Sequence, residues 1–295
     1  MAKHFEHTTL SLFTQRNYDI CINKWIEYLK KSIVKILKTP ELSFKQLKAL
    51  PQIKSSHHVY KQYVNAIVSY MKYHRFGSLT DSQHEIIQDK WRTFMIENDV
   101  VNKEHYKDNT PSERQAPKKL NWADVLKVRD SLPDGIPKLL LSMYTYIEPE
   151  RADYFELELI RTDEKPTSSN YINLTEKKLI LTDFKTKKTY EKLELTVPEE
   201  LMRQILLSLT ETPRQYLFLN RFKKPFERPQ FSNYANRTLT EIFKSIVPST
   251  NLTCLRHSYV SSLDFTKTIR ELDAVAKRMG HDVMTQKKYA WIEPS

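Results

Sequence analysis

The sequence predicts a mainly α protein, in which an N-terminal four-helix unit precedes an α+β unit that holds one small antiparallel sheet. Three observations lead to this fold class. Apolar residues recur at helical spacing through the first hundred residues, β-branched and aromatic runs occur in the middle of the chain, and residues 107–119 combine two prolines with no periodicity. A chain of 295 residues with 40% apolar residues can form two cores. We therefore expect domains at 1–106 and 120–295, joined by a linker at 107–119.

The N-terminal unit is predicted from three apolar stripes and one shorter segment. Thr14 is the expected N-cap of the first helix. Its stripe follows a spacing of three or four residues through Tyr18, Ile22, Trp25, Leu29, Ile33 and Ile36. A second stripe covers residues 59–71, and a third begins after Asp81 and reaches Met95. A short piece around 42–50 completes the four helices.

The second unit is predicted to be mostly helical around three strands. Asn121 is the expected cap of a helix that reaches Leu132, and a buried helix follows at 137–147. The expected strands cover 171–174, 178–184 and 192–197, which are rich in β-branched and aromatic residues. Further helices are expected at 198–209, 233–247, 253–265 and 268–279.

The charge of the chain is compatible with a polyanionic partner. Lys and Arg together number 47 against 36 Asp and Glu, which gives a formal net charge of +11. The excess is +6 before residue 110 and +5 after it, so it is spread over both units rather than gathered in a tail. This distribution favours a body that lies along nucleic acid, although lysine-rich solvated faces give the same balance.

The rare residue types exclude several classes of site. The three glycines, Gly77, Gly135 and Gly280, are too far apart for a dinucleotide fingerprint or a phosphate-binding P-loop. Cys21 and Cys254 form no CxxC motif and no disulfide framework. No apolar run approaches a membrane span, and the N-terminus lacks the apolar core of a signal peptide. We therefore expect an intracellular protein that makes no contact with membranes.

The most informative segment runs from Thr253 to Ile292. Arg256 lies in LRHS on a predicted helix, and Gly280 is the residue type that ends a helix at a position with positive φ. His281 follows this stop, and Tyr289 comes eight residues later. Each residue taken singly has an ordinary structural interpretation, but their order and spacing together resemble the C-terminal motif of the tyrosine recombinase (integrase) family.

The resemblance implies two further site residues upstream. The first arginine of the family corresponds to Arg151 in YTYIEPERADYF, where it is expected to open a helix. The alternative is an exposed arginine that pairs with Asp153 or Glu150. The lysine of the family lies in a β-hairpin turn, for which we choose Lys185, with Lys187 and Lys188 as rivals in the same turn.

The sequence departs from the family pattern at two places. Thr253 occupies the position, three residues before the second arginine, where the family usually has histidine or lysine. His257 is expected to point about 100° away around the helix, which argues against it as a substitute. The spacing from His281 to Tyr289 is also one residue shorter than in many members, with Tyr259 and Tyr190 as the alternative tyrosines.

The resemblance implies a definite chemistry for these residues. Tyr289 attacks the scissile phosphate and forms a 3′-phosphotyrosyl bond. Arg151 and Arg256 offer forked donors to the nonbridging oxygens, His281 adds a donor, and Lys185 protonates the leaving 5′-oxygen. We expect no metal and no cofactor, because the two guanidinium groups supply the positive charge.

These residues lead to a primary hypothesis and two alternatives. The first is a DNA integrase or resolvase whose helical core-binding domain and catalytic domain enclose duplex DNA, and which acts as a homotetramer on synapsed sites. The PSERQ, NWADVLKVRD and LRHSY segments look most like integrases of large eukaryotic DNA viruses and virophages, so the expected location is with DNA in a host nucleus or cytoplasm. The alternatives are a DNA-binding protein on a decayed recombinase scaffold and an enzyme like a type IB topoisomerase.

Overall fold

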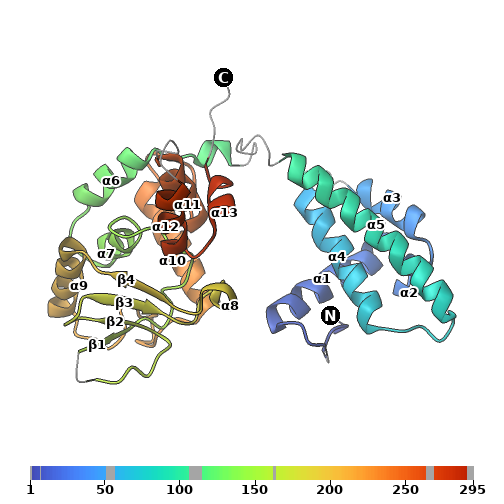
Figure 1. Ribbon diagram of the computed structural model, residues 1–295, viewed down its shortest axis with the longest axis horizontal. Coiled ribbons are helices and arrows are strands. Elements are labelled where there is room, and N and C mark those ends of the chain that lie inside the picture. Colours follow the sequence, from blue (N-terminus) through green and yellow to red (C-terminus); the bar gives the residue numbers. More distant parts are fainter. Residues whose placement is uncertain are drawn as a thin grey trace. The chain divides into compact units, whose positions relative to one another are not determined.

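A computed structural model describes residues 2–6, 8–50, 57–105, 115–161, 164–263 and 269–290. The chain forms two compact units, Met1–Asp108 and Asn109–Ser295 (Figure 1). Most of the predicted linker lies outside the described residues. Within the described ranges, none of the helices has the length and apolar character needed to cross a bilayer.

Unit 1 is helical, with five helices among its described residues where the sequence predicted four. They are α1 (Leu12–Leu29), α2 (Ile33–Lys38), α3 (Pro40–Lys48), α4 (His57–Tyr73) and α5 (Asp81–His105). The predicted first stripe is split because Lys30 adopts a left-handed conformation with φ of 50° and Ser32 caps a new helix. The predicted cap Thr14 is wrong by one turn, since Ser11 accepts the hydrogen bond from the Thr14 amide at 3.2 Å.

Two fully buried tryptophans form the centre of unit 1. Trp25 of α1 and Trp91 of α5 pack edge to face, with their ring centroids 5.7 Å apart. Each indole N–H finds a backbone acceptor, Tyr63 for Trp25 at 3.2 Å and Leu37 for Trp91 at 3.3 Å. The core of unit 1 therefore links α1, α2, α4 and α5, and both buried indole donors are paired.

Unit 2 is mainly helical around a four-stranded sheet, which confirms the predicted fold class. The strands are β1 (Glu158–Ile160), β2 (Asn170–Asn173), β3 (Lys178–Leu181) and β4 (Leu193–Thr196), in the order β1-β2-β3-β4. The three predicted strands pair antiparallel, as expected. The sheet is nevertheless mixed, because β1, which the sequence did not predict, pairs parallel to β2 with Leu159 opposite Ile172.

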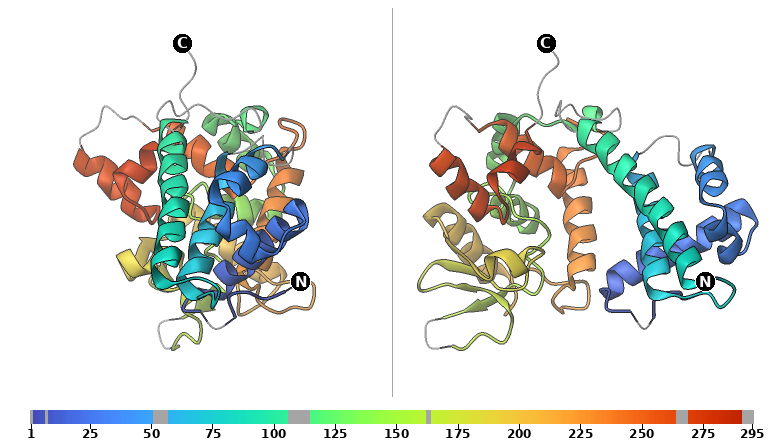
Figure 2. Two further views of the ribbon diagram at one scale, coloured as in Figure 1. Left: turned by 90° about the vertical axis from the view of Figure 1, so that its right-hand side faces the viewer. Right: turned by 45° about the vertical axis from the view of Figure 1, so that its right-hand side comes forward.

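The helices of unit 2 surround this sheet. They are α6 (Trp122–Ser131), α7 (Ile136–Met143), α8 (Lys187–Tyr190), α9 (Glu199–Glu211), α10 (Arg228–Phe243), α11 (Leu252–Ser261), α12 (Ile269–Arg278) and α13 (Val283–Lys287), with a 3-10 turn at Ala116–Lys118. The apolar helix α7 packs against α9 and α10, while α6 packs against α11. Figure 2 shows α12 and α13, in red, above the end of the sheet at which α8 lies. The sequence did not predict the short helices α8 and α13.

Asn170 at the start of β2 fastens two loops to the sheet. Its buried amide donates to the carbonyl oxygens of Asp153 and Asp183 at 3.1 and 2.9 Å. Its side-chain oxygen accepts from the backbone amides of Thr182 and Asp183 at 3.1 and 3.0 Å. The segment that follows Arg151 and the segment that precedes Lys185 are thereby held on the same residue.

We predict that Asn170→Ala lowers the free energy of unfolding by about 2–4 kcal/mol, because it leaves several buried backbone groups without partners. Urea unfolding of the variant and the wild type measures the difference. Asn233→Ala, at an exposed position of α10, is the matched control and is expected to change stability by less than about 0.5 kcal/mol. Equal effects of the two substitutions would contradict the role assigned to Asn170.

Candidate active site

Arg256 is the most deeply buried charged group of the site. It lies on α11, whose first turn is capped by Asn251, which accepts from the Cys254 amide at 2.9 Å. Only 1% of Arg256 is exposed. One terminal nitrogen of its guanidinium donates to the carbonyl of Pro149 and the other to the carbonyl of Met279. This side chain therefore joins α11 to the segment after α7 and to the end of α12.

Arg151 lies in an irregular segment and not at the start of a helix, so the predicted helix is wrong. Residues 148–157 form no helix, and β1 begins at Glu158. Two tertiary contacts engage this segment instead. The Tyr144 hydroxyl donates to the Arg151 carbonyl at 3.0 Å, and Asp153 forms an ion pair with Arg228 of α10. These contacts outweigh local propensity and leave the half-buried Arg151 beside Arg256.

Gly280 ends α12 with the geometry that the sequence predicted. Its φ is +66°, its amide bonds to the Lys277 carbonyl at 2.9 Å, and the His281 amide bonds to the Ala276 carbonyl at 3.0 Å. These two bonds make a Schellman motif. The turn sends the His281 side chain into the interior, where only 3% of it is exposed.

One nitrogen of His281 is occupied and the other is not. Nδ1 lies 3.2 Å from the carbonyl oxygen of Asp282, so it carries the proton and donates. Nε2 is buried and has no hydrogen-bond partner among the described residues. Burial, assisted by the positive charge of Arg256, lowers the pKa of His281 to about 4. The ring is therefore neutral at pH 7.

Tyr289 lies directly after α13 and faces this group. Its phenolic oxygen is within hydrogen-bonding reach of the guanidinium groups of Arg256 and Arg151. The Arg256 guanidinium lies 4.9 Å from the centre of the phenol ring, and the His281 ring is nearly parallel to the phenol, 5.5 Å away. Burial alone raises the pKa of Tyr289, but the two arginines outweigh it and bring the pKa below its usual value.

His257 also contacts Tyr289, contrary to the expectation that it points away. Its Nδ1 lies 2.7 Å from the Tyr289 carbonyl oxygen, and the two ring centroids are 5.0 Å apart. Arg256 and His257 point in different directions from α11, but Tyr289, which follows α13, lies where it contacts both of them. Thr253, by contrast, is exposed.

Lys185 lies in an exposed turn between β3 and α8. It forms no hydrogen bond or ion pair with any residue that the structure describes. The predicted strand ends at Leu181 instead of Phe184, so the connection to β4 is longer than a hairpin turn. The turn is tied to the site by its neighbour Thr186, whose hydroxyl donates to the Gly280 carbonyl at 2.8 Å.

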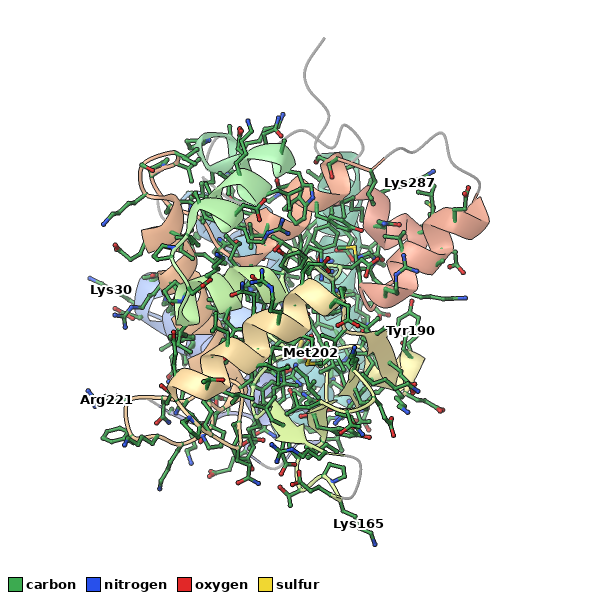
Figure 3. The ribbon with its side chains drawn as sticks, turned by 90° about the vertical axis from the view of Figure 1, so that its left-hand side faces the viewer. Lys30, Lys165, Tyr190, Met202, Arg221 and Lys287 are labelled. Atoms are coloured by element: carbon green, nitrogen blue, oxygen red, sulfur yellow. The ribbon has the colours of Figure 1, made fainter. Side chains whose placement is uncertain are left out.

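The rival residues have other surroundings. Lys187 forms an ion pair with Asp183 at 2.7 Å, and Lys188 is exposed. Tyr259 packs its ring against Trp122 with centroids 5.1 Å apart. Tyr190 lies on α8 at the margin of the sheet (Figure 3). Arg151, Arg256, His281 and Tyr289 thus converge, while Lys185 lies on a segment fastened beside them.

Sequence reasoning missed Glu150 as a member of the site. It is fully buried, and neither carboxyl oxygen has a hydrogen bond of ordinary geometry among the described residues. Burial raises the pKa of Glu150 to about 8, although Arg256 acts against this. The sequence offered Glu150 only as an ion-pair partner of Arg151, and nothing in its pattern indicates burial.

The described residues contain no group of three His, Cys, Asp or Glu side chains that could hold a metal ion. One acidic residue near the site, Asp153, is instead placed against an arginine. Asp153 is paired with Arg228, whose guanidinium also lies 4.4 Å from the centre of the Phe155 ring.

Comparison with known proteins reveals a similar fold at low sequence identity. No protein-family model and no curated protein matches the chain. The structure of the XerH site-specific recombinase bound to a palindromic difH substrate, in a post-cleavage complex, is 14% identical and has a TM-score of 0.56. That match covers 95% of this chain and 76% of XerH. The chain has the tyrosine recombinase fold.

Two further solved structures are similar at lower TM-scores. XerA recombinase is 15% identical, with 97% of this chain and 89% of XerA covered and a TM-score of 0.43. The Tn1549 transposon integrase in complex with transposon right end DNA is 11% identical, with 94% and 95% of the two chains covered and a TM-score of 0.43.

We predict that Glu150→Gln stabilises the protein increasingly as pH rises from about 5 to about 8. The unfolded carboxyl loses its proton near pH 4.5, whereas the folded one keeps it to about pH 8. Ionisation of this carboxyl in the unfolded state therefore lowers the free energy of unfolding of the wild type by up to about 4 kcal/mol across this pH range. The glutamine of the variant does not ionise, so the variant does not show this decrease.

Urea unfolding of the variant and the wild type at about pH 5 and about pH 8.5 measures this effect. The comparison between the two proteins removes contributions that other titrating groups make equally to both. A difference in stability that is the same at both pH values would show that Glu150 is ionised and compensated in the folded state.

Proposed function

We propose that the chain is a site-specific DNA recombinase that cuts and rejoins DNA strands through a 3′-phosphotyrosyl intermediate at Tyr289. The observation that carries the proposal is the convergence of Arg151, Arg256 and His281, from three separate segments, on one phenol. The recombinase fold supports it, because the XerH structure that shares this fold is a post-cleavage complex with its DNA substrate.

The arrangement accounts for each part of a phosphoryl transfer. The Tyr289 oxygen attacks the phosphorus, the bond from phosphorus to the 5′-oxygen breaks, and the phosphate stays on the tyrosine as a diester. Arg151 and Arg256 donate to the nonbridging oxygens, where negative charge gathers in the transition state. Removing one such donor commonly costs about 2.7–4 kcal/mol of barrier. Lys185 supplies the proton that the leaving 5′-oxygen needs.

The position of Arg256 beside Tyr289 favours the enzyme over a decayed DNA-binding scaffold. Here a guanidinium is almost wholly buried, two of its donors bond to backbone carbonyls, and its Nε has no partner among the described residues. The same group lowers the pKa of a tyrosine, which is useful for nucleophilic attack and serves no purpose in binding.

We further propose duplex DNA of a viral or mobile element as the substrate and a homotetramer on two synapsed sites as the active assembly. The net charge of +11 supports the DNA partner, since lysines and arginines across both units can neutralise phosphates. The resemblance of the PSERQ, NWADVLKVRD and LRHSY segments to integrases of DNA viruses and virophages supports the viral origin. Integration or resolution of such an element takes place inside the host cell, so the proposed location of the protein is with DNA in the host nucleus or cytoplasm.

A trapping experiment tests whether Tyr289 is the nucleophile. A suicide substrate, nicked so that the cleaved end diffuses away, is expected to trap a covalent protein–DNA complex without added metal. Tyr289→Phe is expected to abolish this complex, because it removes the attacking oxygen. The control Tyr259→Phe, whose ring packs on Trp122, is expected to retain it. A band that survives Tyr289→Phe would exclude Tyr289 as the nucleophile.

Cleavage rates of two variants distinguish the lysines of the turn. Lys185→Ala is expected to slow cleavage by about 10²–10⁴-fold, because the 5′-oxygen then leaves without a general acid. A substrate with sulfur in place of the 5′-oxygen needs no such proton, so it is expected to restore the rate. The control Lys188→Ala, at an exposed position of the same turn, is expected to slow both substrates equally or neither. If the 5′-sulfur substrate restored the cleavage rate of Lys188→Ala and not that of Lys185→Ala, the general acid would be Lys188.

A further inference from the structure

The geometry around Tyr289 raises the question of where its proton goes. The phenolic oxygen lies in reach of two guanidinium groups, Arg256 and Arg151. A guanidinium has donors and no acceptor, so neither arginine can take a proton. The phenol must therefore lose its proton to another group as it attacks. Thr253, where the family usually has a histidine or lysine, is exposed and cannot act as a base at neutral pH.

His281 provides a suitable acceptor next to the phenol. Its Nδ1 carries the proton and donates to the Asp282 carbonyl, which leaves a lone pair on Nε2. That lone pair is buried and has no partner among the described residues. The His281 ring lies nearly parallel to the Tyr289 ring, 5.5 Å away, so the two groups are neighbours but Nε2 and the phenol are not hydrogen-bonded in the free protein. In this tautomer Nε2 accepts a proton and cannot donate one to a phosphate.

The two other candidate acceptors are less well placed. His257 directs Nδ1 at the backbone carbonyl of Tyr289, so the contact it makes there positions the main chain. The Glu150 carboxyl faces the backbone of Gly280, where a Cβ would lie 3.6 Å from its Oε2. Neither contact involves the phenolic oxygen.

We propose that His281 is the general base of the reaction, and that its Nε2 takes the phenolic proton of Tyr289 as the bond from oxygen to phosphorus forms. This assignment rests on the proposed function. In cleavage the proton passes from Tyr289 to His281, while Lys185 gives a proton to the 5′-oxygen. In rejoining, the 5′-hydroxyl attacks, Lys185 takes its proton back, and His281 returns the proton to the departing phenol. Protons and charges balance over the two steps.

The charges around His281 determine when it can act. Burial and Arg256 keep the ring neutral in the free protein, so the lone pair of Nε2 is available, but the same two effects make it a weak base there. A bound phosphate adds negative charge and raises the affinity of Nε2 for a proton, which strengthens the base once DNA is present. Hydrogen bonds at such sites tighten in the substrate complex. The charged and titratable groups around the ring are Arg256 from α11, Arg151 from the segment after α7, Asp282 beside it, and Tyr289 after α13. Glu150 lies against the neighbouring Gly280.

Single-turnover cleavage by His281 variants tests the proposal. His281→Ala and His281→Asn are both expected to slow formation of the covalent complex by about 10²–10⁴-fold, because an amide can donate a hydrogen bond but cannot take the proton. Added imidazole is expected to restore the cleavage rate of His281→Ala in proportion to the fraction of imidazole that is neutral. A fluorinated tyrosine at position 289 loses its proton more easily, so it is expected to reduce the rate defect of His281→Ala. His257→Ala is the matched control and is expected to show neither rescue.

Modified substrates separate a base from a donor. A methylphosphonate at the scissile position removes the charge that a donor would stabilise, and it is expected to leave the His281→Ala defect unchanged. A 5′-sulfur substrate is expected to leave it unchanged as well. Recovery with the methylphosphonate, or near wild-type activity of His281→Asn, would overturn the proposal and make His281 a donor to the phosphate. If wild-type protein forms no Tyr289-dependent complex on any substrate, the proposed function itself fails.

Discussion

The site depends on the two hydrogen bonds that the Arg256 guanidinium gives to backbone carbonyls. One goes to Pro149, just before Glu150 and Arg151, and the other to Met279, just before Gly280 and His281. A buried guanidinium that loses such partners bears the full cost of its desolvation, so both segments are held close to α11. Arg256 thereby positions the other arginine and the histidine while its own charge faces the tyrosine.

The small sheet serves as the support for this arrangement. Asn170 at the start of β2 holds the segment after Arg151 and the segment before Lys185 by hydrogen bonds to their backbones. Arg228 on α10 contacts both segments again, through Asp153 and Asp183. The hydroxyl of Thr186 then connects the lysine turn to the Gly280 carbonyl. Groups that lie far apart in the chain are thus fixed by bonds to backbone atoms, which tolerate little movement.

Local signals in the sequence were sufficient where a short segment determines its own structure. The LRHS helix and the stop at Gly280 follow from apolar spacing and from the freedom of glycine to adopt positive φ, and the Asn121 cap forms as expected. Arg256, His281 and Tyr289 could be selected because their order and spacing resemble the tyrosine recombinase motif. Their convergence could not, because it depends on where α13 places the tyrosine.

The remaining features depend on tertiary contacts that a single sequence does not show. The three-residue strand β1 has too few residues for a periodic pattern, and it forms because β2 offers it a parallel edge. The helix expected at Arg151 is replaced by an irregular segment because Asp153 and Tyr154 find partners elsewhere. Glu150 is an acid in a charged stretch of sequence, and only the fold shows that it lies in the interior.

In the proposed reaction, a tyrosine that lies beside two arginines attacks the phosphodiester and keeps the 3′-phosphate. The most direct measurement is mass spectrometry of the trapped protein–DNA complex after digestion with nuclease and trypsin. This reaction leaves a nucleotide attached through its 3′-phosphate to the tryptic peptide that begins at Tyr289, after Lys288. A nucleotide on any other peptide, or one attached through a 5′-phosphate, would contradict it.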